Sequence, residues 1–334
     1  MEAGTIPARS GRSIAERPSR ARVPDRAMRW GLTGLAAGIL VLIAYFFVRL
    51  IGESNTALSK FGVLHFVFDN DWDVSRSHFG ALPLVVGTLI TSGIALVIGV
   101  PIAIATALYV TELCPLRARG ALTVVVELLA AVPSVVYGLW GFFVLIPALR
   151  PVEQWVADTF SIVPFVGGHV AGPNYFIAGL ILAIMIIPIV SAITREVMAT
   201  VPPDHKEAAL ALGATRWEMI RTAILPYSRA GISGAAMLGL GRAIGETIAV
   251  TLVIGNAPRI GRQIFDQGYT LAAAPANEFG EAASNALHSS SLIAAGLVLF
   301  VLTLIVNMVA RYYVVRGQRG ARATRSTPVA GATA

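Results

Sequence analysis

The sequence has few charged residues and almost no cysteine. Only 13% of its 334 residues are Asp, Glu, Lys or Arg, whereas soluble domains carry about a quarter. Since 55% of the residues are hydrophobic, we expect lipid rather than water to surround most of the chain. The single cysteine, Cys114, excludes an internal disulfide and a multi-cysteine metal site.

Motifs that would mark an enzyme are also missing. No G-x-x-x-x-G-K-[ST] sequence occurs, so the chain is not expected to bind ATP in the P-loop manner, and energy for any transport must come from a partner. The five histidines are scattered over loops, and no nucleophile lies near a base in the sequence. We therefore expect no catalytic residue, no cofactor and no metal.

Long apolar runs are what the sequence does contain. A membrane-spanning helix needs about 20 apolar residues, and about six segments meet this requirement, which predicts an all-α integral membrane protein. The first run follows a basic tail but is longer than the core of a signal peptide and lacks an A-x-A cleavage site, so we interpret it as a retained span. The predicted spans are 30–51, 82–110, 121–149, 176–194, 231–255 and 291–314.

Basic residues predict the orientation of these spans. With the N-terminus inside, the inner segments hold nineteen Lys and Arg residues and the outer segments hold five, a strong positive-inside bias. Both termini are therefore predicted to be cytoplasmic, and the net charge of +7 is a topology signal rather than a sign of a nucleic-acid partner. Residues 1–27 and 317–334 have too few large apolar side chains to fold, and we expect two disordered cytoplasmic tails around a membrane domain at 28–316.

The most informative segment is the predicted cytoplasmic loop at 195–230. After Pro202 and Pro203 end the preceding helix, Asp204 is expected to cap a short helix, with Glu207 completing a capping box. Gly213 should break that helix, and a second one is expected from Thr215 to Ile224, ending at Pro226. The loop is thus predicted to form an elbow of two helices.

The first arm of this elbow is rich in alanine and leucine. An apolar, small-faced elbow on the cytoplasmic side suits docking into the groove of a partner; the alternative is an amphipathic elbow that lies on the membrane. The residues expected to make the partner contact are Glu207, Ala208, Ala209, Leu212 and Gly213.

Glu207-Ala208-Ala209, followed by Gly213 and later by Leu225-Pro226, resembles the EAA motif of ABC importer permeases. The sequence departs from that motif at Ala223, where an isoleucine is usual. The resemblance implies a type I ABC importer permease fold, in which this loop is a coupling helix seated in a cleft of the ATPase subunit. It also implies a place in the cell (inner, cytoplasmic) membrane.

Three stretches are similar to the PstC-like permease subunits of phosphate importers over about residues 30–315: VPPDHKEAALALGATRWEMI, GLGRAIGETIAV (239–250) and FGALPLVVGTL (79–89). The resemblance implies translocation of inorganic phosphate. It also implies as partners a second homologous permease, two ATP-binding subunits and an extracytoplasmic phosphate-binding protein. Alternatives are a permease for another small solute, such as sulfate or an amino acid, and a stand-alone secondary transporter, which would usually show two related halves.

Three ionisable residues lie well within predicted spans: Glu127, Arg242 and Glu246. Such groups are costly in lipid, so none should face it. Arg242 and Glu246 are four residues apart and can pair on one helix face. Either the pair only locks helix packing, or Arg242 offers its planar guanidinium to an anion that crosses the membrane while Glu246 holds it in place. In phosphate permeases the matching Arg and Glu are held to matter for transport.

Other polar residues in the spans leave two alternatives open. Glu127 is either a packing partner for a hydroxyl or an Arg on a neighbouring helix, or it lines the pathway. Ser134 and Thr247, with Thr88, Thr91 and Thr251, could line a hydrated path or simply bond to their own helix backbone.

The predicted outer loops contain acidic residues and histidines. Loop 52–81 contains Asp69, Asp71, Asp73, His65 and His78, at spacings that match no coordination motif. We expect this loop, together with 257–290, to contact an external binding protein.

Overall fold

The computed structural model describes residues 22–323 apart from 162, 164, 168–169 and 171. The tail predictions for 1–21 and 324–334 therefore lie outside the described residues. Two compact units, Met1–Gly52 and Glu53–Ala334, are considered separately.

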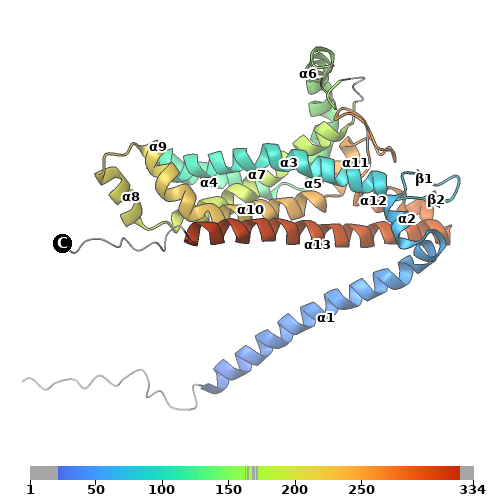
Figure 1. The fold of residues 1–334 in the computed structure, drawn as a ribbon, viewed down its shortest axis with the longest axis horizontal. Helices are drawn as coiled ribbons and strands as arrows, with labels where there is room; N and C mark the ends of the chain where they lie inside the picture. The colour runs from blue at the N-terminus through green and yellow to red at the C-terminus, as the bar shows by residue number, and fades with distance from the viewer. Residues whose placement is uncertain (1–21, 162, 164, 168–169, 171, 324–334) are drawn as a thin grey trace, which may run out of the picture. The chain divides into compact units, whose positions relative to one another are not determined.

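The described chain is almost entirely helical (Figure 1). Its first half forms α1 (Arg22–Phe61), α2 (Val63–Phe68), α3 (Leu82–Leu108), α4 (Leu116–Ala131), α5 (Ser134–Trp140) and α6 (Ile146–Thr159). Its second half forms α7 (Tyr175–Ala199), α8 (Pro203–Ala211), α9 (Arg216–Met219), α10 (Leu225–Ile244), α11 (Ile248–Val253), α12 (Ala273–Ala282) and α13 (Ala286–Ala323). Three π-helical turns are η3 (Tyr109–Leu113), η4 (Gly141–Leu145) and η5 (Ile220–Ile224), and β1 (Trp72–Asp73) pairs antiparallel with β2 (His78–Phe79).

Within the described residues, five helices are long and apolar enough to cross a membrane: Ala27–Phe61, Leu82–Leu113, Ser134–Thr159, Tyr175–Ala199 and Ala286–Tyr312. They confirm long helices at the predicted spans 30–51, 82–110 and 176–194, and at most of 291–314. Helices α1 and α13 extend into the segments predicted to be tails, since α1 begins at Arg22, within 1–27, and α13 continues through 317–323, within 317–334.

The predicted span 121–149 is not one helix. α4 ends at Ala131, Val132 adopts an extended conformation, and α5 starts after Pro133. Proline cannot donate the helical hydrogen bond, and it disfavours helical geometry in the residue before it. The expectation of a continuous helix here was wrong, because hydropathy does not register this break.

The predicted span 231–255 is interrupted as well. α10 ends at Ile244, and α11 begins only at Ile248. The intervening residues are Gly245, Glu246 and Thr247, so α10 and α11 together occupy the fifth expected span as a broken helix.

The centre of the 53–334 unit is the packing of α3 against α7, with α10 on both. Small residues allow this close approach: a Cβ added to Gly179 would lie 2.5 Å from the Ile94 side chain, and one added to Gly231 would lie 2.4 Å from Val197. In Figure 1, α3, α7, α10 and α13 run side by side, with α8 and α9 at one end and α2, β1, β2 and α12 at the other.

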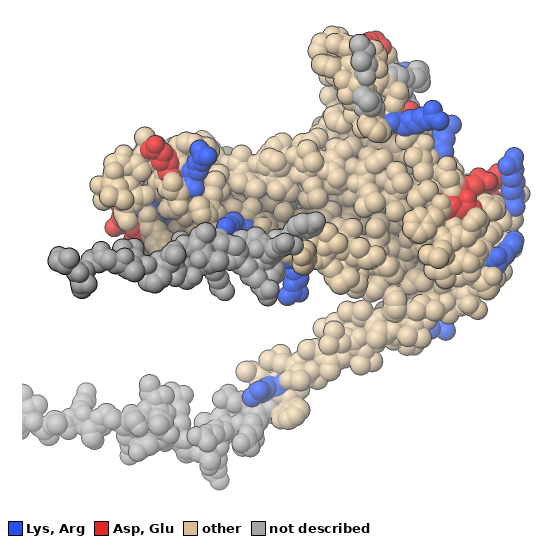
Figure 2. Space-filling model, in the orientation of Figure 1, with Lys and Arg blue, Asp and Glu red and all other residues tan. Residues whose placement is uncertain are grey.

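Charge is distributed along this unit as a membrane protein requires. Figure 2 shows Lys, Arg, Asp and Glu of the 53–334 unit mainly toward its two ends on the visible face, with a largely uncharged stretch between them. Burying ionisable groups in lipid is costly, so this middle stretch is the part suited to the bilayer.

Candidate functional site

The elbow expected between α7 and α10 is present, but its capping differs from the prediction. Asp204 does not cap α8. Pro202 takes the cap position without a side-chain hydrogen bond, and Pro203 is the first helical residue, a position that suits proline because it needs no donor. The capping box is instead formed by Thr215 and Glu218 at the start of α9.

Gly213 makes the turn between the two arms. Its φ is +83°, a left-handed conformation that glycine adopts without the strain of other residues. The predicted break at Gly213 is therefore confirmed, with Leu212 as the C-cap of α8.

The inner side of the elbow is attached to the helix bundle. Ala209 packs against an apolar cluster at the end of the core helices that we predict to be cytoplasmic. The buried members of this cluster are Ala107, Met198, Val201, Met219, Ile220 and Ile224. Lys206 Nζ lies 2.6 Å from Glu112 Oε1 in η3. These contacts fix α8 to the end of α3.

The outer side of the elbow has no cover within the described chain. Leu212 is 90% exposed and Trp217 is 63% exposed, and Glu207 and Ala208 are exposed as well. Of the five predicted coupling residues, only Ala209 turns inward to a half-buried position. Adjacent exposed apolar side chains at a charged end of a protein are typical of an interaction surface.

Arg242 lies near the end of α10, directly before the helix break. It is exposed and borders a hollow of about 660 Å³. Along with Arg242, the hollow is lined by Ile189, Gly234, Met237, Leu238, Gly241 and Asn307. Among the described residues, no carboxylate forms an ion pair with Arg242.

The predicted pairing of Arg242 with Glu246 along one helix face does not occur in this structure. Helix α10 ends between the two residues, so the geometry of an i,i+4 pair no longer applies. Glu246 Oε1 instead accepts a hydrogen bond of 3.4 Å from the Ala249 N–H. Glu246 precedes the N-cap residue Thr247, and a carboxylate near the start of a helix is favoured by the helix dipole.

The break at Pro133 lies next to the break at Gly245. Gly138 of α5 packs on α11, where an added Cβ would lie 2.9 Å from the Ala249 Cα. Tyr137 donates its hydroxyl to the Leu129 carbonyl at 2.8 Å. This bond adds to the long 3.4 Å bond that the same carbonyl accepts from the Val132 N–H, in place of the helical donor that Pro133 lacks. Tyr137 is also within electrostatic range of Arg242.

Two polar residues of this region were not predicted from the sequence. Tyr137 could have been found as the first aromatic hydroxyl after the Pro133 break, and Asn307 as a lone amide within the predicted span 291–314. Of the predicted residues, Ser134 is the first residue of α5 and is half-buried, and Thr247 precedes α11.

Glu127 has a partner on a neighbouring helix. Its Oε1 lies 2.9 Å from Arg195 Nη2 of α7. This geometry is that of the packing alternative, in which an arginine on a neighbouring helix neutralises the glutamate; its place in a pathway stays a prediction.

The threonines of the predicted spans donate to backbone carbonyls two to four residues before them. Thr88 donates to the Leu84 carbonyl at 2.7 Å and Thr251 to the Thr247 carbonyl at 2.7 Å, and Thr91 and Thr247 likewise use nearby carbonyls. Each hydroxyl can still accept a bond, as Thr88 does from the Leu271 N–H at 3.0 Å.

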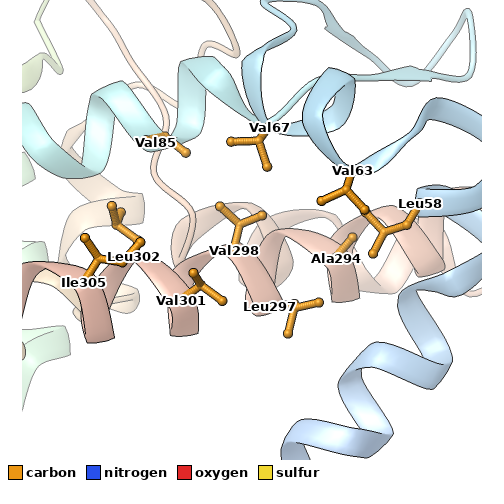
Figure 3. Close-up of a pocket in the computed structure, with 10 residues that line it drawn as sticks. All are labelled: Leu58, Val63, Val67, Val85, Ala294, Leu297, Val298, Val301, Leu302 and Ile305. Carbon is orange, nitrogen blue, oxygen red and sulfur yellow. The ribbon is translucent and has the colours of Figure 1, made fainter.

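A second hollow has a different chemistry. It holds about 220 Å³ between the 58–67 segment, α3 and α13, and Figure 3 shows its apolar side chains. They are Leu58, Val63, Val67, Val85, Ala294, Leu297, Val298, Val301, Leu302 and Ile305. No lining side chain could bind an ion, so this hollow is not a candidate pathway.

The two predicted outer loops are joined to each other. Trp72 Nε1 donates to Glu278 Oε2 at 3.1 Å, and His288 Nε2 lies 2.9 Å from the same oxygen. The His288 ring stacks on Phe79 with centroids 5.2 Å apart. The loops therefore form one surface, whose contact with a binding protein stays a prediction.

Comparisons with known proteins agree with this architecture. Residues 99–316 match the family described as "Binding-protein-dependent transport system inner membrane component". A Mesorhizobium japonicum protein named phosphate transport system permease protein PstC is 46% identical over 83% of this chain and 86% of its own length. A Haemophilus influenzae protein of the same name is 40% identical over 84% of this chain and 90% of its own.

A solved structure shares the fold at much lower identity. It belongs to a bacterial ABC transporter involved in the import of the acidic polysaccharide alginate, and it matches with a TM-score of 0.56 at 18% identity over 88% of this chain and 98% of that chain. The fold is therefore that of a type I ABC importer permease. The helical elbow, the apolar helices and these relatives lead to one conclusion: this chain belongs to the family of binding-protein-dependent transport system inner membrane components and is a multi-pass membrane permease subunit, not itself an ATPase.

Proposed function

We propose that this chain forms one half of the channel of an ATP-driven importer of inorganic phosphate. The other half is a second, homologous permease, and the complex includes two ATP-binding subunits and an extracytoplasmic phosphate-binding protein. Both termini lie on the cytoplasmic side. The names of the relatives support phosphate as the ion, and the positive-inside bias supports the orientation.

The observation that carries this proposal is the surroundings of Arg242. An arginine at the centre of a membrane helix costs about 2.5–3.5 kcal/mol on insertion scales, and this one is exposed on the surface of the single chain and has no carboxylate partner among the described residues. Such a group requires a water-filled path or a partner chain over it. A channel formed between two permeases supplies both.

The chemistry beside Arg242 suits an anion. A guanidinium offers parallel N–H donors to two oxygens of one phosphate. Because Glu246 is engaged by the start of α11, it does not neutralise Arg242 directly. Asn307 lines the same hollow as Arg242, and Tyr137 lies within electrostatic range of Arg242, so both can take part in a hydrated path.

The elbow supplies the connection to ATP hydrolysis. Its outer side presents Leu212 and Ala208 to a partner groove, and its inner side is fixed to α3 through Lys206 and Glu112. Movement of an ATP-binding subunit at this surface would then reposition the core helices.

Uptake of labelled phosphate by the complete transporter tests the proposal, with labelled sulfate as the second substrate. Arg242→Ala should reduce phosphate uptake at least about 10-fold, because hydrogen bonds to a charged group are worth about 1.5–3 kcal/mol. Arg242→Lys, which keeps the charge but loses the planar fork, should retain partial uptake.

The matched control is Arg229→Ala, which removes an exposed arginine near the other end of the same helix and should leave uptake unchanged. Assembly is checked by copurification of all subunits. If Arg242→Ala transports phosphate normally in an intact complex, the pathway role is wrong. If the wild type carries sulfate but not phosphate, the proposed substrate is wrong.

A further inference from the structure

The α2–β2 segment (residues 63–79) brings two histidines and one aspartate together in space. His65 lies in α2, Asp69 is the C-cap of that helix, and His78 lies in β2. One potential ligand atom from each of the three residues lies within 4.8 Å of the others. Their spacing in the sequence matches no known coordination motif; the β1–β2 turn is what brings His78 back to the helix.

The geometry converges on one carboxylate oxygen. Asp69 Oδ2 lies 3.4 Å from His65 Nε2 and 2.5 Å from His78 Nε2. In a tetrahedral zinc site with bonds of about 2.0–2.2 Å, neighbouring ligand atoms are about 3.3–3.6 Å apart. The distance between Asp69 Oδ2 and His65 Nε2 already fits this range. The distance between Asp69 Oδ2 and His78 Nε2 has to lengthen by about 1 Å.

The carboxylate is held in position by its own backbone surroundings. The Asp69 carbonyl accepts the Leu82 N–H at 3.1 Å. Gly80 packs directly on this residue, since an added Cβ would lie 2.7 Å from the Asp69 Cβ. The Asp71 N–H lies 3.4 Å from Oδ1, an outer contact of the kind that orients metal ligands. The aspartate is thus the fixed member of the set.

The histidines leave the set accessible. His65 is 63% exposed and His78 is 37% exposed, whereas Asp69 is only 18% exposed. A metal could enter from solvent, and the exposed side would keep a coordination position for water. Neutral imidazoles with one carboxylate suit zinc and related divalent transition metals rather than calcium or magnesium.

We propose that His65, Asp69 and His78 form a binding site for one divalent transition metal ion, with zinc as the best fit. Bound metal links α2 to β2 and thereby stiffens the surface that also includes Trp72 and Glu278. The site is separate from the pathway proposed around Arg242 and does not depend on the transported ion.

The test uses the full chain, purified in detergent with an affinity tag that contains no histidine. After dialysis against zinc and then metal-free buffer, elemental analysis should find about one zinc per chain. A titration against a competing chelator gives the affinity. Cobalt in place of zinc should show the visible ligand-field bands of a tetrahedral site.

Three variants and one control identify the ligands. H65A, H78A and D69N should each weaken zinc binding at least about 100-fold, because even the loss of an outer-shell partner costs about 10–100-fold. D71N, a neighbouring acidic residue whose side chain is not a ligand, should bind as the wild type does.

Because His65 is mostly exposed, H65A should leave the fold intact, and a thermal unfolding scan in chelator verifies this. The proposal is overturned if the wild type takes up no stoichiometric zinc. It is also overturned if H65A and H78A bind zinc as tightly as the wild type.

Discussion

The exposed leucine at the tip of the elbow permits a sharp test of coupling. The Leu212 side chain is 90% exposed, and it lies beside Gly213 at the end of α8. Replacing it with glutamate removes almost no contact within this chain. Leu212→Glu should therefore change the free energy of unfolding by no more than about 0.5 kcal/mol, the usual range for surface positions.

Its effect on partner binding should be much larger. Fully burying a leucine contributes about 1.5–3 kcal/mol, and Leu212 has nearly all of that area still available. The variant would lose this contribution and place a carboxylate in an apolar groove, so we expect a loss of at least about 2–3 kcal/mol. Since about 1.4 kcal/mol is tenfold in a dissociation constant, the ATP-binding subunits should bind about 30- to 150-fold more weakly.

The assay measures binding of the purified ATP-binding subunits to the permease pair in detergent, together with ATP hydrolysis by the assembled complex. The matched control is Leu116→Glu, which changes another leucine, 83% exposed at the start of α4 and outside the elbow. Unaltered subunit binding by Leu212→Glu, with the fold intact, would refute the reasoning that the elbow is the coupling surface.

Two further predictions concern the fold itself. Gly179→Val should lower the free energy of unfolding by about 1–3 kcal/mol through overpacking, because an added Cβ would lie 2.5 Å from Ile94; chemical denaturation in detergent measures this, and an unchanged midpoint would contradict the close α3–α7 packing. For Asp69, burial raises the pKa, but the hydrogen bond with His78, the Asp71 N–H and the nearby imidazoles together lower it below its ordinary value of 3.8. The ionised carboxylate therefore stabilises the fold above about pH 4, and this stabilisation is lost as the pH falls through the lowered pKa of the folded state. Thermal unfolding in chelator from pH 5 to 3 should show that D69N loses less stability on acidification than the wild type. Identical stability profiles of the two proteins would contradict this prediction.

Hydropathy predicted where helices exist better than where they break. The windows at 82–110 and 176–194 correspond closely to α3 and α7, because a long apolar run in lipid has to satisfy its backbone as a helix. The proline itself marks the interruption at Pro133, but its apolar neighbours keep the hydropathy high across it. The interruption at Gly245 was hidden because a hydropathy window averages over the three residues between α10 and α11.

Local rules also failed where a competing rule applied. Asp204 is of a residue type that commonly caps helices. However, Pro203 suits the first helical position, so Pro202 occupies the N-cap position instead. The Arg242–Glu246 pair was predicted from a spacing that has meaning only in an unbroken helix. The elbow itself was predictable, because the alanine-rich run favours a helix locally and Gly213 ends that helix within a few residues.

Long-range groupings could not be predicted from a single sequence. Nothing in the spacing of Glu127 and Arg195 indicates that their side chains meet, because the meeting depends on how α4 lies on α7. The same holds for His65 and His78, which depend on a turn of the backbone between β1 and β2.

Helix α3 connects two distant surfaces of the chain. With η3 it spans 82–113, a rod of about 48 Å at 1.5 Å per residue. One end is bonded to the Asp69 carbonyl, and the other carries Glu112, which holds Lys206 of the elbow. Thermodynamic linkage then makes any communication through this rod reciprocal: if nucleotide-driven motion at the elbow changes the affinity of the far surface for its ligand, that ligand changes the nucleotide affinity by the same factor.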